Sequence, residues 1–136
     1  MEPFDVVAAV IRFHQKILCV QRGKGNHSYL AYKYEFPGGK VEPGETEEHA
    51  IIREIKEELN LEISVEKKFL SVQHAYPDIT ITLHSFLCNC ENPSLTLTEH
   101  LNYKWLSIGE LKELEWAAAD EPIVRKLEEM ENSELA

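Results

Sequence analysis

The sequence has few cysteines and no long hydrophobic run. Its three cysteines, Cys19, Cys88 and Cys90, form no CxxC pair and are odd in number, which argues against a zinc cage or a disulfide framework. No apolar stretch approaches the roughly 18 residues of a membrane span, and the start does not resemble a signal peptide. We therefore expect a soluble cytoplasmic protein with reduced cysteines on strands and no membrane partner.

Basic residues are also scarce. Fourteen Lys and Arg stand against 24 Asp and Glu, a net charge of −10, which argues against polymeric DNA or RNA as a partner. Half of that excess lies between Glu42 and Glu58, where seven glutamates face only Arg53 and Lys56. Such a local excess of negative charge favours bound cations.

Internal repeats, low-complexity segments and a Walker-type G-x4-G-K-[ST] motif are absent as well, so a P-loop nucleotidase is excluded. With 136 residues, 43% of them hydrophobic, the chain can bury about 70% of its unfolded surface in one core. We expect a single domain over residues 1–136.

The first third of the chain alternates strand and loop patterns. Val6–Phe13 is almost continuously apolar, and Lys16–Arg22 follows it after two residues, which predicts two strands joined by a tight turn. Residues 23–33 have neither a helical nor a strand period and are predicted to form a loop, and loops of this size often carry binding residues. Tyr34–Phe36 is a short strand that Pro37-Gly38-Gly39 should end.

From Thr46 to Leu59 the apolar period becomes helical, with Thr46 as the expected N-cap. The apolar stripe comprises Ile51, Ile52, Ile55 and Leu59. Strands are then expected over 61–76 and 79–90, joined at Pro77-Asp78 as a hairpin. Shorter elements should follow: strands at 95–98 and 103–106, a short helix capped by Ser107 that ends at Leu114, and an amphipathic helix over 117–130.

Three carboxylates share one side of the first helix. Glu54, Glu57 and Glu58 are spaced i, i+3 and i+4, next to the apolar stripe. Hard oxygen ligands in this number suit Mg²⁺ or Mn²⁺ rather than zinc. A solvated acidic face is the simpler interpretation of these residues taken alone.

The wider spacing favours the metal site. The chain has Gly39, then Glu45 after five residues, and after seven more the run Arg53-Glu54-Ile55-Lys56-Glu57-Glu58-Leu59-Asn60-Leu61. This spacing resembles the Nudix box, G-x5-E-x7-R-E-U-x-E-E-x-G-U, where U is a bulky aliphatic residue. The box thus spans 39–61, and only Asn60 departs from it. Asn is the usual second choice after Gly in the left-handed geometry that follows a helix.

The resemblance extends over nearly the whole chain and is closest to the MutT-like branch, which hydrolyses nucleoside triphosphates to monophosphate and pyrophosphate. It implies a mixed α/β fold, an α/β/α sandwich with a mixed β-sheet and a loop-helix-loop catalytic motif. It also implies Mg²⁺, with Mn²⁺ as a substitute, because an acidic site binds a triphosphate only when a cation bridges the two.

Carried over position by position, the resemblance assigns catalytic roles. Glu54 or Glu99 would accept the proton of the attacking water, and Arg53 and Glu45 would support the carboxylates. Lys40 would lie near the phosphates. The implied metal ligands are the Gly38 carbonyl, Glu54, Glu57, Glu58 and Glu99; an exposed loop carboxylate is the alternative for Glu99.

Substrate contacts are predicted outside the box. Arg22 matches a nucleotide-binding arginine, although it could also be an ordinary exposed arginine. Phe36 and the residues around Ile81 and Leu83 would form the wall of a slot for the base, although a role in the core remains open for each. Asp120 matches an Asn or Asp that binds the base, or else it caps the last helix. An ionised carboxylate only accepts hydrogen bonds, which favours CTP or a modified dCTP without excluding 8-oxo-dGTP.

Two other functions are compatible with the motif. One is a Nudix pyrophosphatase for ADP-ribose or dinucleoside polyphosphates, against which the small size argues. The other is a nucleotide sensor without turnover, which would have no need of all three helix carboxylates. The partner in each case is a small-molecule nucleotide, and the chain is expected to be a monomer or a homodimer.

Overall fold

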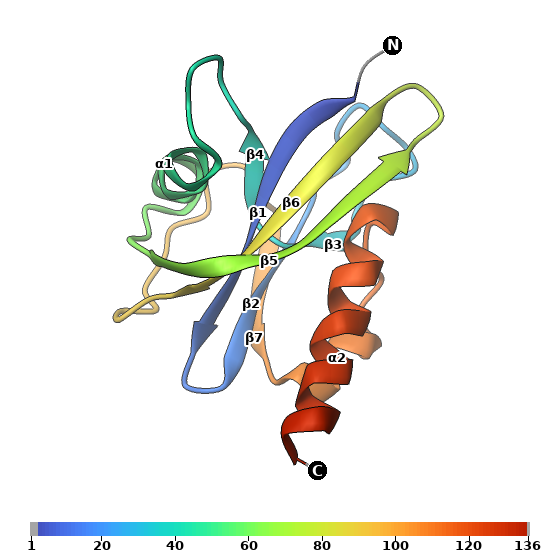
Figure 1. The fold of residues 1–136 in the computed structure, drawn as a ribbon. Helices are drawn as coiled ribbons and strands as arrows, with labels where there is room; N and C mark the ends of the chain where they lie inside the picture. The colour runs from blue at the N-terminus through green and yellow to red at the C-terminus, as the bar shows by residue number, and fades with distance from the viewer. Residues whose placement is uncertain (1–2, 136) are drawn as a thin grey trace.

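The computed structural model describes residues 3–135, and strand β1 (Phe4–Phe13) lies inside its seven-stranded sheet (Figure 1). β1 pairs in parallel with β6 (Thr80–Asn89) and antiparallel with β2 (Lys16–Gln21) and β4 (Gly38–Lys40). The sheet is therefore mixed, as predicted. Three further strands pair with β2 or β6: β3 (Tyr34–Glu35) and β7 (Asn102–Leu106) with β2, and β5 (Ser64–Ala75) with β6.

The alternation of side chains along β1 creates two cores. Val7, Ala9 and Ile11 pack in one cluster with the apolar stripe of α1 (Glu47–Leu59). Ala8 and Val10 point the other way and pack with the buried side of α2 (Glu121–Leu135). The two helices lie on opposite sides of the sheet (Figure 1), which confirms the predicted α/β/α sandwich.

Local features predicted from the sequence are confirmed at the ends of α1. The Thr46 side chain accepts a hydrogen bond from the backbone N–H of His49 at 3.1 Å and so caps the helix. Asn60 ends the helix with φ of 51°, in the left-handed region where Asn replaces the glycine of the box. The tight turn after β1 is built from His14 and Gln15, both with positive φ.

The prediction that Pro37-Gly38-Gly39 ends the strand before it is confirmed, since β3 ends at Glu35, but the two glycines also begin a new strand. Gly38 and Gly39 belong to β4, which pairs with β1 at Val7 and Ala8. A Cβ on Gly38 would lie 1.8 Å from the Val7 carbonyl oxygen, so only glycine lets the two strands approach this closely. The glycine-rich segment is thus paired with the central strand β1, and this pairing fixes the position from which the chain leads to α1.

Three predictions need correction. Residues 95–98 form no strand, because Thr96 and Thr98 donate backbone hydrogen bonds to the carbonyls at the end of α1 instead of to a strand. Ile52 is 45% exposed, since it lies beside the stripe that faces the sheet. The last helix begins at Glu121, later than predicted, after a 3-10 turn over Ala118–Asp120.

The short helix after β7 spans Ile108–Glu113 and is a 3-10 helix, and Glu110 accepts a hydrogen bond from the backbone N–H of Ser107 at 3.0 Å.

All three cysteines are free and buried, although Cys90 lies just beyond β6 rather than on it. Burial raises the pKa of Cys19 and Cys88 to about 12, which makes each a poor nucleophile.

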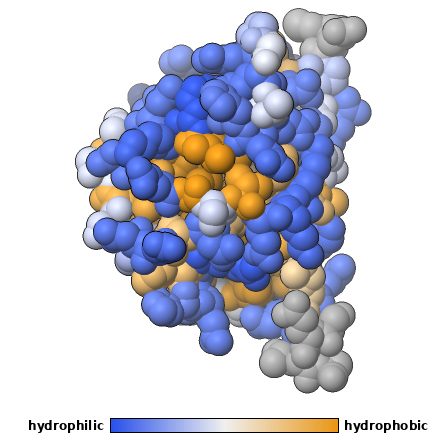
Figure 2. Space-filling model, turned by 60° about the vertical axis from the view of Figure 1, so that its left-hand side comes forward, coloured by the Kyte–Doolittle hydropathy of each residue, from blue (hydrophilic) through white to orange (hydrophobic). Residues whose placement is uncertain are grey.

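None of the helices in residues 3–135 is long and apolar enough to cross a membrane. On the face drawn in Figure 2, apolar side chains gather in the middle and hydrophilic side chains surround them. A hydrophobic area with a polar border is typical of a binding surface.

Candidate active site

The three carboxylates of α1 lie in different surroundings. Glu58 is only 7% exposed, the Glu54 side chain is mostly buried, and the Glu57 side chain is 59% exposed. Gly39 leaves room for Glu54, because a Cβ on this glycine would lie 2.3 Å from Oε2 of Glu54. Glu54 and Glu58 therefore lie at the margin of the core, as the spacing predicts, whereas Glu57 points toward solvent.

Arg53 ties this carboxylate group together. Its Nε and Nη2 donate to the two carboxylate oxygens of Glu45 at 2.6 and 2.8 Å, and its Nη1 donates to Oε1 of Glu54 at 2.8 Å. Weaker contacts reach Glu57 at 3.4 Å and the Lys40 carbonyl at 3.2 Å. The two hydrogen bonds from Arg53 to Glu45 hold the pKa of Glu45 well below its usual range. The charge of Arg53 also neutralises part of the repulsion among Glu45, Glu54 and Glu57.

Glu58 is the least satisfied of these carboxylates. Its Oε2 is buried and has no hydrogen-bond partner among the described residues. Burial, with the charges of Glu54, Glu99 and Glu35, raises its pKa to about 9. Such an orphaned buried oxygen calls for a ligand that supplies positive charge or donors.

Glu58 faces a polar pocket of about 230 Å³ that includes two of the other predicted ligands. The pocket is lined by Arg22, Gly23, Gly25, Glu35, Gly38, Glu58, Glu99 and His100. Within residues 3–135, however, no three His, Cys, Asp or Glu side chains are gathered closely enough to hold a metal ion. A cation there would require some side chains to turn toward it.

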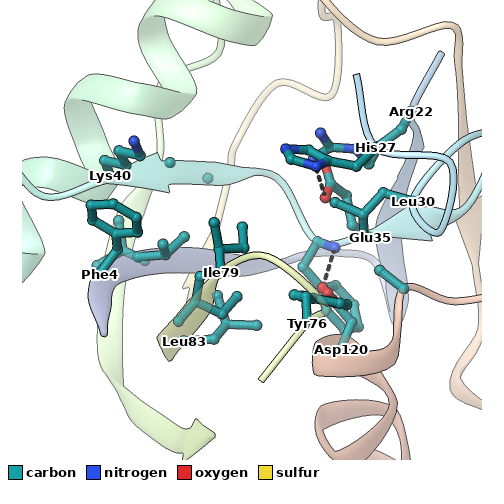
Figure 3. A pocket seen from close by; sticks show the side chains of 17 residues that line it. Phe4, Arg22, His27, Leu30, Glu35, Lys40, Tyr76, Ile79, Leu83 and Asp120 are labelled. Atoms are coloured by element: carbon teal, nitrogen blue, oxygen red, sulfur yellow. Dashed lines mark hydrogen bonds and ion pairs between the residues drawn. The ribbon is translucent and has the colours of Figure 1, made fainter. Parts of the chain in front are cut away.

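A second pocket, of about 310 Å³, is drawn in Figure 3. It adjoins the first, because Arg22, Glu35 and Gly38 line both. Apolar side chains from β1 and β6 form much of its lining, among them Phe4, Ile81 and Leu83. Both predicted cationic contacts line it: Arg22 Nη1 donates to Glu35 Oε1 at 3.1 Å, and Lys40 Nζ lies 4.4 Å from the centre of the Phe4 ring.

Asp120 lies in the wall of this pocket and is buried. Its Oδ2 accepts a hydrogen bond from the backbone N–H of Phe36 at 2.9 Å, which fixes the segment before β4 (Figure 3). No hydrogen bond from Asp120 to the backbone of α2 is found within the described residues, so the capping alternative is not supported. Burial, and secondarily the charge of Glu35, raises the pKa of Asp120.

Aromatic side chains complete the wall. Phe36 stacks on Trp116 with ring centres 4.7 Å apart, so it serves both the core and the pocket. The Tyr76 hydroxyl accepts a hydrogen bond from the Ala119 N–H at 3.0 Å, next to Asp120. The long hairpin is thereby joined to the 3-10 turn that precedes α2.

Sequence reasoning missed Glu35 and His100. The Glu35 carboxylate bridges Arg22 and His100 Nε2, the latter at 3.0 Å, and stands between the two pockets. Position gives a partial signal, because Glu35 directly precedes Phe36-Pro37 and His100 directly follows Glu99. Their proximity depends on the pairing of strands far apart in the chain.

Comparison with known proteins agrees with this geometry. A model of the NUDIX domain matches residues 1–127. The CTP pyrophosphohydrolase of Escherichia coli is 36% identical over 124 residues, 91% of this chain and 90% of that protein. The 8-oxo-dGTP diphosphatase of Escherichia coli is 29% identical over 130 residues, 96% of this chain and 100% of that protein.

A solved structure supports the same relationship. The MutT protein of methicillin-resistant Staphylococcus aureus, described as a Nudix hydrolase, is 43% identical and superposes with a TM-score of 0.74, covering 92% of this chain and 95% of that one. The box on β4 and α1, the mixed sheet between two helices and these relatives agree, and the chain belongs to the Nudix hydrolase family, in its MutT-like branch.

Proposed function

We propose that this protein hydrolyses nucleoside triphosphates to the monophosphate and pyrophosphate, with Mg²⁺ as the cation and Mn²⁺ as a substitute. One observation carries the proposal: a carboxylate-lined pocket and a largely apolar pocket adjoin along Arg22, Glu35 and Gly38. A nucleotide has the same two parts, an anionic phosphate chain that needs a cation and a flat base that needs an apolar slot.

The residues present fit a divalent cation. Glu58 Oε2 is buried without a partner, and the missing side chain of Gly39 makes room for the Glu54 carboxylate. Oxygen donors of this kind suit Mg²⁺ and Mn²⁺. The proposed ligands are the Gly38 carbonyl with Glu54, Glu57, Glu58 and Glu99. When bound, the cation lowers the pKa of water and neutralises charge on the phosphates.

The protein's own groups would position the proton acceptor. Arg53 holds Oε1 of Glu54 at 2.8 Å, which leaves Oε2, on the Gly39 side, to accept the proton of the attacking water. Glu45 in turn holds Arg53 with two short bonds and fixes its guanidinium plane. Glu99 is the second candidate acceptor, since it lines the same pocket as Glu58.

The second pocket would hold the nucleoside. Lys40 and Arg22 bring positive charge to its lining, where the phosphates would leave it, and Phe36 offers a wall for the base. Asp120 is the polar group best placed to read the base. As a carboxylate it accepts from an amino group such as cytosine N4, which favours CTP or a modified dCTP. Because its pKa is raised, Asp120 can also be protonated and then donates a hydrogen bond, so 8-oxo-dGTP stays the alternative substrate.

The test is a substrate panel. Purified protein with Mg²⁺ is offered CTP, dCTP, 5-methyl-dCTP, dGTP, 8-oxo-dGTP, ADP-ribose and diadenosine tetraphosphate, and products are separated by ion-exchange chromatography. We expect monophosphate and pyrophosphate in equal amounts from at least one triphosphate. Cleavage of ADP-ribose or the dinucleotide without any triphosphate would overturn the proposal, and binding of nucleotides without products would indicate a sensor.

A further inference from the structure

The imidazole of His100 has one unexplained nitrogen. Its side chain is 7% exposed, and Nε2 lies 3.0 Å from Oε2 of Glu35. An ionised carboxylate only accepts hydrogen bonds, so Nε2 carries the proton and donates it. In the neutral ring, Nδ1 then holds a lone pair, and this atom is buried without a hydrogen-bond partner among the described residues.

The surroundings of His100 indicate what Nδ1 lacks. The ring lines the polar pocket of about 230 Å³ together with Glu58 and Glu99, and Glu58 Oε2 is likewise buried without a partner. Both residues line one pocket and each has a buried side-chain atom without a partner, so a positive ion bound there would satisfy both at once. The guanidinium of Arg22 lines the same pocket, but its Nη1 is bonded to Glu35 at 3.1 Å.

We propose that His100 Nδ1 is a nitrogen ligand of the divalent cation bound with Glu58 and Glu99. This inference rests on the proposed function, from which the cation comes. A histidine whose other nitrogen donates to a carboxylate is the usual arrangement of a metal-binding imidazole, because the carboxylate fixes the tautomer and the ring orientation. Glu35 is that carboxylate here.

Completing the ligand set requires rotation of side chains, since no three acidic or imidazole groups of residues 3–135 are gathered closely enough to hold a metal ion. Glu99 is exposed and has several rotamers available, whereas His100 and Glu58 are held in the wall. An imidazole ligand also has a consequence for metal choice: it strengthens binding of Mn²⁺ relative to Mg²⁺, which prefers oxygen ligands only.

His84, whose side chain is 12% exposed, shows that an unpartnered nitrogen is not a general feature of the mostly buried histidines in this fold. Its Nε2 also faces a carboxylate, Oδ1 of Asp5 at 3.0 Å, but its Nδ1 is 2.9 Å from the Ser71 hydroxyl. His84 lines neither of the two pockets. It is therefore a matched control for substitution of His100.

The experiment measures Mn²⁺ binding to the whole protein by electron paramagnetic resonance. Free and bound Mn²⁺ give the dissociation constant, and electron spin echo modulation detects ¹⁴N nuclei bound to the ion. Three variants are compared: His100→Gln, which keeps an N–H toward Glu35; His100→Asn, which shortens the side chain; and His84→Gln. Circular dichroism establishes that each variant folds.

We expect nitrogen modulation in the wild type that changes on labelling histidine with ¹⁵N, persists in His84→Gln and disappears in both His100 variants. The Mn²⁺ dissociation constant should rise by about 10- to 100-fold in His100→Gln and stay unchanged in His84→Gln. Bound Mn²⁺ without histidine modulation in the wild type overturns the inference and leaves the proposed function standing. Failure of the wild type to bind Mn²⁺ at all overturns both.

Discussion

Substitution of Asp120 by Asn exchanges an acceptor for a donor in the wall of the nucleoside pocket. Oδ2 of Asp120 accepts from the Phe36 N–H at 2.9 Å, and the amide oxygen of Asn can take over this bond. The NH₂ group then occupies the position of the second carboxylate oxygen. The variant therefore preserves the structural bond and reverses the polarity offered to the base.

The magnitude follows from that geometry. Because the Phe36 bond survives, the free energy of unfolding should change by less than about 1 kcal/mol. A hydrogen bond between a charged acceptor and the cytosine N4 amine contributes about 1.5–3 kcal/mol, which corresponds to about 10- to 100-fold in kcat/KM. Uracil carries a carbonyl at this position and gains the new donor, so the CTP to UTP ratio of kcat/KM should fall by at least about tenfold.

The assay is pyrophosphate release from CTP and UTP across pH 6 to 9, alongside urea unfolding. Burial and the charge of Glu35 raise the pKa of Asp120. As the pH rises, Asp120 loses its proton and can then only accept a hydrogen bond, which favours cytosine. The CTP to UTP ratio of kcat/KM for the wild type should therefore increase with pH. In Asp120→Asn it should not. Glu121→Gln, an exposed neighbour, is the control. A ratio and pH profile equal to the wild type would refute base recognition by Asp120 and leave it as the acceptor for Phe36.

Two predictions concern the framework of the site. In Gly38→Ala, the new Cβ would meet the Val7 carbonyl oxygen at 1.8 Å, so β4 must move and the free energy of unfolding should fall by about 3 kcal/mol, whereas Gly109→Ala, with open space around it, should change little. Arg53 depresses the pKa of Glu45, so the stability that this carboxylate contributes is present above pH 4.5 and is lost as the pH falls below it. In urea unfolding at pH 6 and pH 3.5, Glu45→Gln should therefore lose less stability on acidification than the wild type does; an equal loss would contradict this.

The helix and its carboxylates could be predicted because the signals are local. Thr46, the apolar stripe and Asn60 each specify geometry through residues three or four positions away. The family resemblance rests on the same short stretch. Together with the alternation of strand patterns, it was enough to predict the sandwich and the mixed sheet.

The two pockets could not be predicted in the same way, because their walls depend on long-range pairing. Glu35 and His100 meet only because β3 and β7 both pair with β2. The contact between Asp120 and Phe36 joins residues 84 positions apart. Residues 95–98 have a strand pattern, but the N–H groups of Thr96 and Thr98 donate to carbonyls at the end of α1. The assigned roles of the site residues and the extent of the domain over 1–136 stay predictions.

The most direct test of the central claim compares pyrophosphate release by the wild type, Glu54→Gln and Glu48→Gln in the presence of Mg²⁺. Both substitutions remove one negative charge from α1, but Glu48 is exposed in the first turn, while Glu54 contacts Arg53 and faces Gly39. The account predicts that Glu54→Gln lowers kcat by at least about 10²-fold at an unchanged free energy of unfolding, while Glu48→Gln retains wild-type activity. Equal activity of all three proteins would contradict it.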